Sequence, residues 1–337
     1  MFGSCCKHFC QGNRELDRQD LADRFRFEWQ CAVALFAGFH KISDSGSHPF
    51  IEKRFPPNSH SSKDGRLTRF ELETWDSGRL IVNHAYADLF RRHDWLTFAT
   101  IWSRTADAAI AKKLRTDRIT LKFTLDDNGV ERPFYIKRHG RSSWKEYLKP
   151  LLRLTWPILG ARNEWNAILD FHNVGLPTMA PVAFGESGAN SFLITESLEN
   201  CDKLSNVLAD SVKSPVPLST HRQISVTVAN LARTMHNSGL HHQDFYLGHL
   251  MQSQTNPETI YIIDLGRVHK QTPLSQRWII KDLAQLNFSA STVPLLERLR
   301  FLRKYLGHPL SGKDRHLIAR IQAKTNAIAR HSRKNQL

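Results

Sequence analysis

The sequence lacks an apolar run long enough to cross a membrane. Its longest apolar stretch, residues 31–39, is far shorter than the roughly 20 residues that a spanning helix needs. The first residues also lack the basic flank and sustained apolar segment of a secretory signal. We therefore expect a cytoplasmic protein, and peripheral contact with the cytoplasmic face of a membrane stays open.

Cysteine is scarce, with five in 337 residues. An odd number of cysteines does not suit a secreted disulfide scaffold. Cys5, Cys6 and Cys10 lie close to His8, but adjacent ligands without a second ligand pair do not match the usual zinc spacing. We expect a reduced, disordered N-terminus rather than a metal site.

Acidic residues are in the minority, with 32 Asp and Glu against 47 Lys and Arg, which gives a formal net charge of +15. A basic surface attracts nucleic acid, an anionic membrane face, or an acidic glycan or nucleotide. No zinc finger, homeodomain or RNA-recognition motif is present, and the basic residues are spread along the chain. We therefore expect no nucleic-acid partner.

The residue pattern divides the chain into three regions. Residues 1–75 are expected to be an extension, partly disordered or linker, because residues 43–64 are rich in Ser, His, Pro and Gly. Residues 80–198 contain strand patterns with a preceding helix, and residues 199–330 are mostly helical. This order predicts an α+β fold with two lobes and a cleft between them, a common position for a nucleotide.

A hairpin is the clearest local signal. Residues 119–125 alternate with a period of two, residues 134–138 form the returning strand, and Asp126-Asp-Asn-Gly129 between them is a typical hairpin turn. Residues 85–113 are predicted to be mainly helical. Further helices are expected at 144–154, 163–172 and 221–238, and further strands at 181–185, 191–195 and directly before Asp264.

Two segments carry chemistry, His242-Gln-Asp-Phe-Tyr-Leu-Gly-His249 and Tyr261-Ile-Ile-Asp-Leu-Gly266. Phosphoryl transfer needs a group that orients the acceptor hydroxyl, metal ligands, and a cation on the phosphates. Asp244 could accept the hydroxyl proton. His249 falls where protein kinases carry a metal-binding Asn, and Asp264 would hold magnesium.

A lysine and a glutamate would complete such a site. Lys137 on a predicted strand would reach the α- and β-phosphates, and Glu164 on a predicted helix could position that lysine. Taken singly, each residue has an ordinary alternative, such as a solvated lysine, a surface glutamate or a turn aspartate. The order of all these residues along the chain favours phosphotransfer.

This combination resembles the lipopolysaccharide core heptose kinase family (RfaP/WaaP and InaA type), whose fold is protein-kinase-like. The Asp-Phe-Tyr-Leu-x-His string that ends at His249 is the most specific match, and the similarity runs from about residue 80 to 310. The other matching stretches are residues 134–139, 144–149, 157–161 with Glu164-Trp165, 182–186, 194–198, 263–265 and 281–284.

The resemblance implies a bilobal protein-kinase-like fold, with a small N-lobe built on an antiparallel sheet and one main helix, and a larger helical C-lobe. It implies transfer from ATP, with Mg²⁺, to a heptose hydroxyl of the lipopolysaccharide core oligosaccharide, with Asp244 as catalytic base. It also implies a hinge at residues 195–198, where backbone groups of Glu196 and Leu198 would bind adenine.

The chain departs from the family and from protein kinases at three places. Gln243 stands where family members often carry Arg, which makes control by activation-loop phosphorylation unexpected. No Gly-rich loop precedes Lys137, and the turn at residues 115–118 is the candidate for covering the phosphates. The Asp-Leu-Gly sequence at 264–266 is closer to the corresponding motif of ordinary kinases than to the variants found in this family. This departure concerns the identity of the acceptor more than it concerns catalysis.

Residues 144–153 form an amphipathic pattern with Trp, Tyr and Leu on one face and Lys145, Lys149 and Arg153 on another. Such a helix can lie on an anionic inner-membrane surface. The alternative is a helix packed on the small lobe with solvated lysines, and Pro150 would kink or break it.

Two other functions stay open. One is a kinase for another small molecule or for protein. The other is a catalytically inactive nucleotide-binding scaffold in envelope biogenesis. The presence of Lys137, Asp244 and Asp264 together counts against the scaffold, because such proteins usually lack at least one of these groups.

Overall fold

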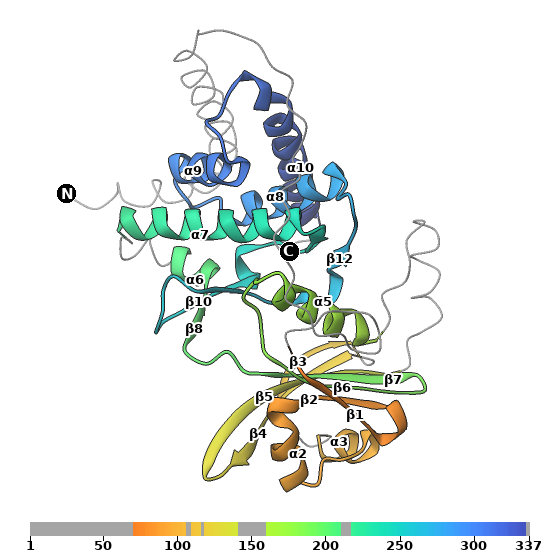
Figure 1. The fold of residues 1–337 in the computed structure, drawn as a ribbon. Coiled ribbons are helices and arrows are strands. Elements are labelled where there is room, and N and C mark those ends of the chain that lie inside the picture. The colour runs from red at the N-terminus through yellow and green to blue at the C-terminus, as the bar shows by residue number, and fades with distance from the viewer. Residues whose placement is uncertain (1–69, 106–108, 116–117, 141–159, 210–216, 335–337) are drawn as a thin grey trace, which may run out of the picture.

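Two lobes make up the part of the chain that the computed structural model describes, which comprises residues 70–105, 109–115, 118–140, 160–209 and 217–334 (Figure 1). The N-terminal lobe is built on an antiparallel sheet, and the C-terminal lobe is mostly helical. The expected α+β bilobal fold is therefore confirmed. Among the described helices, none is both long enough and apolar enough to cross a bilayer.

Some expected features lie outside the described residues. They are the N-terminal cysteines, the linker at 43–64, the amphipathic segment 144–153 and the middle of the turn at 115–118.

Seven strands form the N-lobe sheet in the order β1-β2-β6-β7-β5-β4-β3, and every neighbouring pair is antiparallel. Strand β5, third from the β3 edge of the sheet, carries Lys137. The strands are β1 (Leu72–Trp75), β2 (Leu80–Asn83), β3 (Ala109–Arg115), β4 (Arg118–Asp127), β5 (Val130–His139), β6 (Pro181–Ser187) and β7 (Asn190–Glu196).

The predicted hairpin joins β4 to β5. Asn128 and Gly129 form its two-residue loop with φ angles of 56° and 87°. Two positive φ angles in succession define a type I′ turn, whose twist matches that of the paired strands. The Gly129 N–H also donates a hydrogen bond of 2.9 Å to Asp126 Oδ1. The Asp-Asp-Asn-Gly sequence therefore forms the hairpin turn that was predicted.

The sheet is covered on both faces. Helices α2 (Ala87–Arg92) and α3 (Phe98–Arg104) pack with one apolar cluster of the sheet, which includes Phe90 and Ile101. Helix α5 (Arg162–Asn173) packs on β6 and β7, where Trp165 stacks on Phe184 with ring centroids 6.0 Å apart. Because α5 belongs to the large core that continues into the C-lobe, it joins the two lobes (Figure 1).

The expectation of a mainly helical segment at 85–113 is confirmed where α2 and α3 lie and is wrong for residues 109–113, which belong to strand β3. Asp94 takes a left-handed φ of 56° between α2 and α3, and Thr97 begins α3 by accepting a hydrogen bond from the Thr100 N–H. The Ala-rich residues that follow form strand β3, which pairs with β4. Tertiary pairing thus overrides the helix propensity of alanine.

The sheet also begins earlier in the chain than expected. Strand β1 lies inside the region 1–75 that was expected to be an extension, and it pairs with β2 at the edge of the sheet. The boundaries at 80–198 and 199–330 stay predictions.

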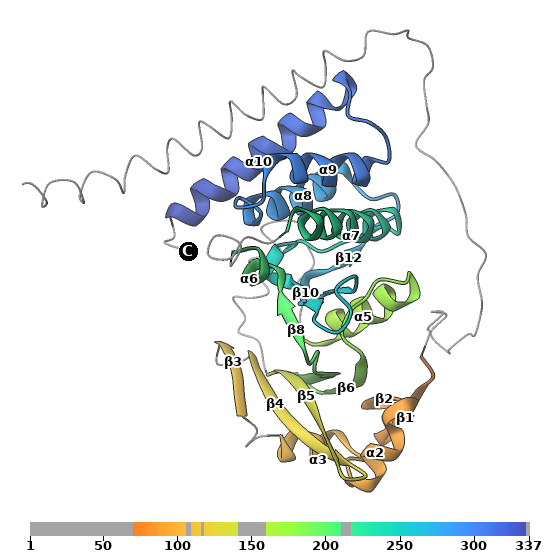
Figure 2. The same ribbon diagram turned by 90° about the vertical axis from the view of Figure 1, so that its left-hand side faces the viewer.

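The C-lobe stacks its helices on the side away from the N-lobe sheet (Figure 2). The predicted apolar stripe of α7 is confirmed, because Ile224, Val228, Leu231 and Met235 are buried. The helices are α6 (Leu204–Ala209), α7 (Leu218–Asn237), α8 (Gln276–Ser289), α9 (Leu295–Leu306) and α10 (Arg315–Lys334).

Two small sheets lie between these helices and the N-lobe. One joins β8 (Cys201–Lys203), β10 (Leu250–Ser253) and β11 (Ile260–Ile262), and the other pairs β9 (Leu240–His241) with β12 (His269–Lys270). Residues 242–249 run between β9 and β10, and residues 263–268 run between β11 and β12. The small sheets therefore hold the ends of both motif-bearing loops.

His241 is buried at the end of β9. Its ring stacks on Trp278 with centroids 4.4 Å apart and on His269 at 6.1 Å. Burial lowers the pKa of His241 from 6.5 to about 4. The folded protein therefore holds His241 neutral at pH values where the unfolded chain would protonate it.

We expect the free energy of unfolding to fall as the pH decreases from 7 to 4.5. The unfolded state binds a proton at His241 below about pH 6.5, whereas the folded state does not, so this histidine contributes a loss of up to about 2–3 kcal/mol. Urea unfolding of His241→Phe beside the wild type should show a shallower decline with pH for the variant. An equal decline in both proteins would contradict this assignment.

Candidate active site

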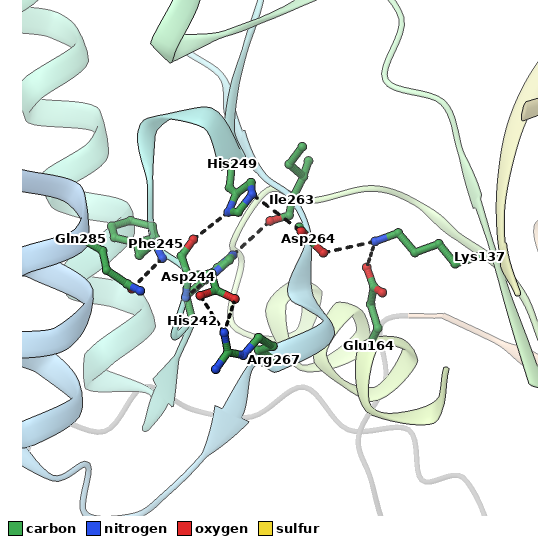
Figure 3. Close-up of polar contacts among 10 residues, drawn as sticks. All are labelled: Lys137, Glu164, His242, Asp244, Phe245, His249, Ile263, Asp264, Arg267 and Gln285. Atoms are coloured by element: carbon green, nitrogen blue, oxygen red, sulfur yellow. Dashed lines mark hydrogen bonds and ion pairs between the residues drawn. The ribbon is translucent and has the colours of Figure 1, made fainter. Parts of the chain in front are cut away.

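Three charged side chains from three elements meet between the lobes (Figure 3). The Lys137 Nζ atom on β5 lies 2.5 Å from Glu164 Oε1 on α5 and 3.5 Å from Asp264 Oδ1. Burial disfavours the charge of Lys137, but the carboxylates of Glu164 and Asp264 outweigh burial and raise its pKa. Lys137 is therefore a permanent cation, placed where it could contact an anionic ligand.

The loop that carries Asp264 is attached to helix α5. The Asn163 side-chain amide donates hydrogen bonds of 3.0 Å to the carbonyls of Gly266 and Val268. Asp264 itself has a left-handed backbone with φ 61°. A Cβ atom at Gly266 would lie 3.4 Å from Glu164 Oε2, which is an ordinary van der Waals contact, so the loop passes close to the helix without requiring glycine at this position.

The loop that carries Asp244 is bound to helix α8 by a buried carboxylate. Asp282 is fully buried and accepts hydrogen bonds from the backbone N–H groups of His242 at 2.7 Å and Gln243 at 2.8 Å. Burial alone would raise the pKa of Asp282, but the hydrogen bond and charge of His236 and the backbone bond from His242 lower it. Asp282 is therefore an ionised anchor for the start of the loop.

Two more side chains of α8 bind the rest of this loop. Gln285 accepts a hydrogen bond of 3.1 Å from the Phe245 N–H and donates one of 2.6 Å to the Gln243 carbonyl. Ser289 accepts one of 2.9 Å from the Leu247 N–H. Residues at 282, 285 and 289 share one face of a helix, so this face binds successive backbone groups of the loop.

The orientation of two histidines follows from their hydrogen bonds. Because a carbonyl can only accept, the His242 Nε2–H donates to the Ile263 carbonyl at 3.0 Å, and His242 Nδ1 accepts from the Asp244 N–H at 3.2 Å. Burial lowers the pKa of His242, in agreement with a neutral ring. His249 Nδ1–H donates to the Asp244 carbonyl at 2.7 Å, which turns its Nε2 toward Asp264 Oδ2, 3.7 Å away.

The Asp244 carboxylate contacts a cation. Arg267 Nη1 lies 3.0 Å from both of its oxygens, and the Arg267 side chain is 57% exposed. The backbone of Asp244 is thus held by hydrogen bonds within the loop, whereas its carboxylate contacts the partly exposed side chain of Arg267.

Glu196 and Leu198 lie apart from this cluster. The Glu196 carboxylate is bound by Arg132 Nη2 at 2.6 Å and by the Tyr86 hydroxyl at 2.8 Å. Leu198 packs on the C-lobe core. Any contact of Glu196 with a nucleotide would therefore come from its backbone, as the hinge interpretation requires.

The structure brings together five of the residues chosen from the sequence, and their chemical roles stay predictions. It adds Asn163, Arg267, Asp282 and Gln285, which were not chosen. An acid inside the apolar pattern of residues 279–286 is a signal that could have identified Asp282, because a buried carboxylate requires partners. The other three have no distinctive local pattern.

The chain has relatives of known family. A model of the lipopolysaccharide kinase (Kdo/WaaP) family matches residues 102–305. The chain is 34% identical over 254 residues to the Escherichia coli protein named lipopolysaccharide core heptose(I) kinase WaaP. This alignment covers 68% of this chain and 94% of that relative. It is 36% identical over 205 residues to the Pseudomonas aeruginosa protein of the same name, covering 57% and 75%.

A solved structure gives the same result. The structure titled WaaP in complex with acyl carrier protein aligns with a TM-score of 0.58 and 28% identity, and the alignment covers 74% of this chain and 98% of that one. The resemblance found in the sequence motifs is thus confirmed by independent comparisons of sequence and fold. The chain belongs to the lipopolysaccharide kinase (Kdo/WaaP) family.

Proposed function

We propose that this protein transfers the γ-phosphoryl group of ATP to a hydroxyl of a heptose in the inner core of lipopolysaccharide. The observation that carries the proposal is the pairing of Lys137 with both Glu164 and Asp264, beside the anchored loop of Asp244. Membership of the Kdo/WaaP family and relatives named heptose(I) kinases support the acceptor class.

On the nucleotide side, Lys137 would contact the α- and β-phosphates. Glu164 would hold the lysine in place, since their 2.5 Å contact fixes the Nζ atom near the Asp264 loop. Backbone groups of Glu196 and Leu198 would receive the adenine ring. The Glu196 side chain is compatible with this role, because Arg132 binds its carboxylate at 2.6 Å and joins the end of β7 to β5.

Magnesium would be held by Asp264, with His249 beside it. Mg²⁺ is usually bound by one or two carboxylates together with substrate phosphates, so the half-exposed Asp264 fits this need. Among the described residues, no group of three or more His, Cys, Asp or Glu side chains could hold a metal ion, and the phosphates of ATP would supply further ligands. The ion would neutralise charge on the transferring phosphoryl group.

Asp244 would act on the acceptor hydroxyl. The hydroxyl oxygen forms a bond to the γ-phosphorus, the bond from that phosphorus to the β,γ-bridging oxygen breaks, and the hydroxyl proton passes to the Asp244 carboxylate. The negative charge remaining on ADP would be stabilised by Lys137. The protein mainly supplies position and electrostatic stabilisation, as is usual for phosphoryl transfer.

The proposed location is the cytoplasm, with peripheral contact at the cytoplasmic face of the inner membrane. A lipid-anchored acceptor would require the enzyme to approach a membrane surface. The net charge of +15 favours attraction to anionic lipids.

Asp244→Asn should lower kcat for phosphate transfer by about 10²- to 10⁴-fold, the usual contribution of a general base. The amide keeps the shape of the side chain but cannot accept the hydroxyl proton. The measurement is transfer of labelled γ-phosphate with magnesium to dephosphorylated core lipopolysaccharide.

Binding of an ATP analogue and the thermal unfolding midpoint should stay close to the wild-type values in Asp244→Asn. Undiminished turnover in this variant would refute the role of Asp244. A wild-type protein that binds ATP but labels no glycan would instead favour another acceptor or a scaffold.

We propose a second binding function, for an acyl group carried by acyl carrier protein. The C-lobe contains an apolar pocket between α7, α8, α9 and α10, and a related structure is titled as a complex with acyl carrier protein. A carrier protein presents its acyl chain on a phosphate-containing arm, which suits an apolar pocket in a basic protein. Residues that line the pocket include Leu208, Ile224, Val228, Leu286, Ala290, Val293, Leu302 and Ile321.

Ala290→Leu should fill part of this pocket and weaken binding of dodecanoyl acyl carrier protein by about 5- to 30-fold, since one or two displaced methylenes are worth about 1–2 kcal/mol. Binding of the carrier protein without its acyl chain should not change. Ala323→Leu makes the same change at an exposed position of α10 and is the matched control. Equal acyl-dependent binding by both variants would contradict an acyl site here.

A further inference from the structure

We propose that Arg267 and Lys281 form a receptor for a carboxylate group of the acceptor glycan, next to the hydroxyl that is phosphorylated. This inference rests on the proposed function, because it takes Asp244 as the base for that hydroxyl. It adds a determinant of acceptor specificity, carried by two cations outside the nucleotide side of the site.

Arg267 is placed to exchange one anion for another. Among the described residues, its guanidinium contacts are both made through Nη1, to the two oxygens of Asp244. An arginine carries five N–H donors in a planar fork that suits a carboxylate or phosphate. Since 57% of the side chain is exposed, a ligand from solvent can reach the Arg267 side chain.

Lys281 lies in the same electrostatic cluster. Its Nζ donates a hydrogen bond of 3.3 Å to Gln243 Oε1, and Gln243 Nε2 donates one of 2.9 Å to the Arg267 carbonyl. The Lys281 ammonium also lies 5.4 Å from the ring centroid of Trp278. Gln243, which stands where family members often carry Arg, thus joins the two cation-bearing segments through one side chain.

The two cations repel one another. Burial lowers the pKa of Lys281, and the Arg267 charge lowers it further, while Asp244 opposes this effect. A second anion beside Arg267 would relieve the repulsion. The site is therefore favourable for a negatively charged ligand even while Asp244 is ionised.

The surrounding segment has a surplus of positive charge. No acidic residue lies between Asp264 and Asp282, whereas Arg267, Lys270, Arg277 and Lys281 do. Lys270 approaches Asp170 at 3.8 Å. Figure 3 shows Lys137 beside Asp264 and Arg267 beside Asp244, so the cations for nucleotide and acceptor contact different carboxylates.

This arrangement links acceptor binding to the availability of the Asp244 carboxylate as a proton acceptor. Without acceptor, Arg267 occupies both oxygens of Asp244. An anionic group of the acceptor takes over the guanidinium, and the released carboxylate accepts the proton of the neighbouring hydroxyl as that oxygen bonds to the γ-phosphorus of ATP. A glycan without the negative charge would leave Asp244 paired with Arg267.

The test uses dephosphorylated core oligosaccharide with its carboxylates intact or reduced to primary alcohols, and full-length protein with ATP and magnesium. For the wild type, kcat/KM should be about 10- to 100-fold higher with the intact glycan, the usual range for a charge-assisted hydrogen bond. Arg267→Gln and Lys281→Gln should each reduce this preference severalfold, with an unchanged KM for ATP. Arg303→Gln, an exposed change of equal charge on α9, should keep it.

The outcomes separate the two claims. Equal use of both glycans by the wild type would overturn this inference and leave the proposed function standing. A raised KM for ATP in Arg267→Gln with an intact glycan preference would overturn it too, because Arg267 would then serve the nucleotide. Transfer to neither glycan would overturn the proposed function and this inference with it. The wild-type comparison decides even where a variant fails to fold.

Discussion

The position of the Asp244 loop depends on one face of helix α8. Asp282, Gln285 and Ser289 lie on that face and bind backbone groups from His242 to Leu247. A short loop between two strands has few backbone partners of its own, so buried side chains must supply them. The ionised Asp282 makes the strongest of these contacts, since hydrogen bonds to a charged acceptor exceed those to a neutral one.

A second set of contacts aligns the N-lobe with this anchored loop. Helix α5 packs on the sheet and shares its core with the C-lobe. It holds Lys137 through Glu164, and it holds the Asp264 loop through Asn163. Helix α5 thus positions the groups proposed for the nucleotide, and helix α8 positions the loop of Asp244, which is proposed for the acceptor. Such preorganisation is the main means by which a protein accelerates phosphoryl transfer.

Local patterns sufficed to predict the elements with strong periodicity. The β4–β5 hairpin followed from alternation and an Asn-Gly turn, and α7 followed from its apolar stripe. The prediction failed for residues 109–113, because an alanine-rich segment has helix propensity and only its pairing with β4 makes it a strand. Lys137, Glu164, Asp264, Asp244 and His249 were chosen by motif order, and the fold brings them together.

The contacts that organise the site could not be predicted in the same way. Asp282 and Gln285 bind a loop about forty residues earlier in the chain, and nothing in the local sequence specifies that pairing. Arg267 follows the Asp-Leu-Gly motif but is an ordinary surface residue until its contact with Asp244 is known. Long-range hydrogen bonds of this kind depend on the tertiary fold.

The most direct measurement of the central claim, that α8 sets the position of Asp244, is a comparison of Gln285→Met with the wild type. Methionine keeps the volume but leaves the Phe245 N–H without its acceptor, a loss of about 1–3 kcal/mol. The account predicts faster amide exchange at Phe245, a kcat lowered by about tenfold or more, and ATP affinity within about threefold of wild type. Gln322→Met on α10 should change none of these. A normal kcat together with faster exchange at Phe245 would contradict the account.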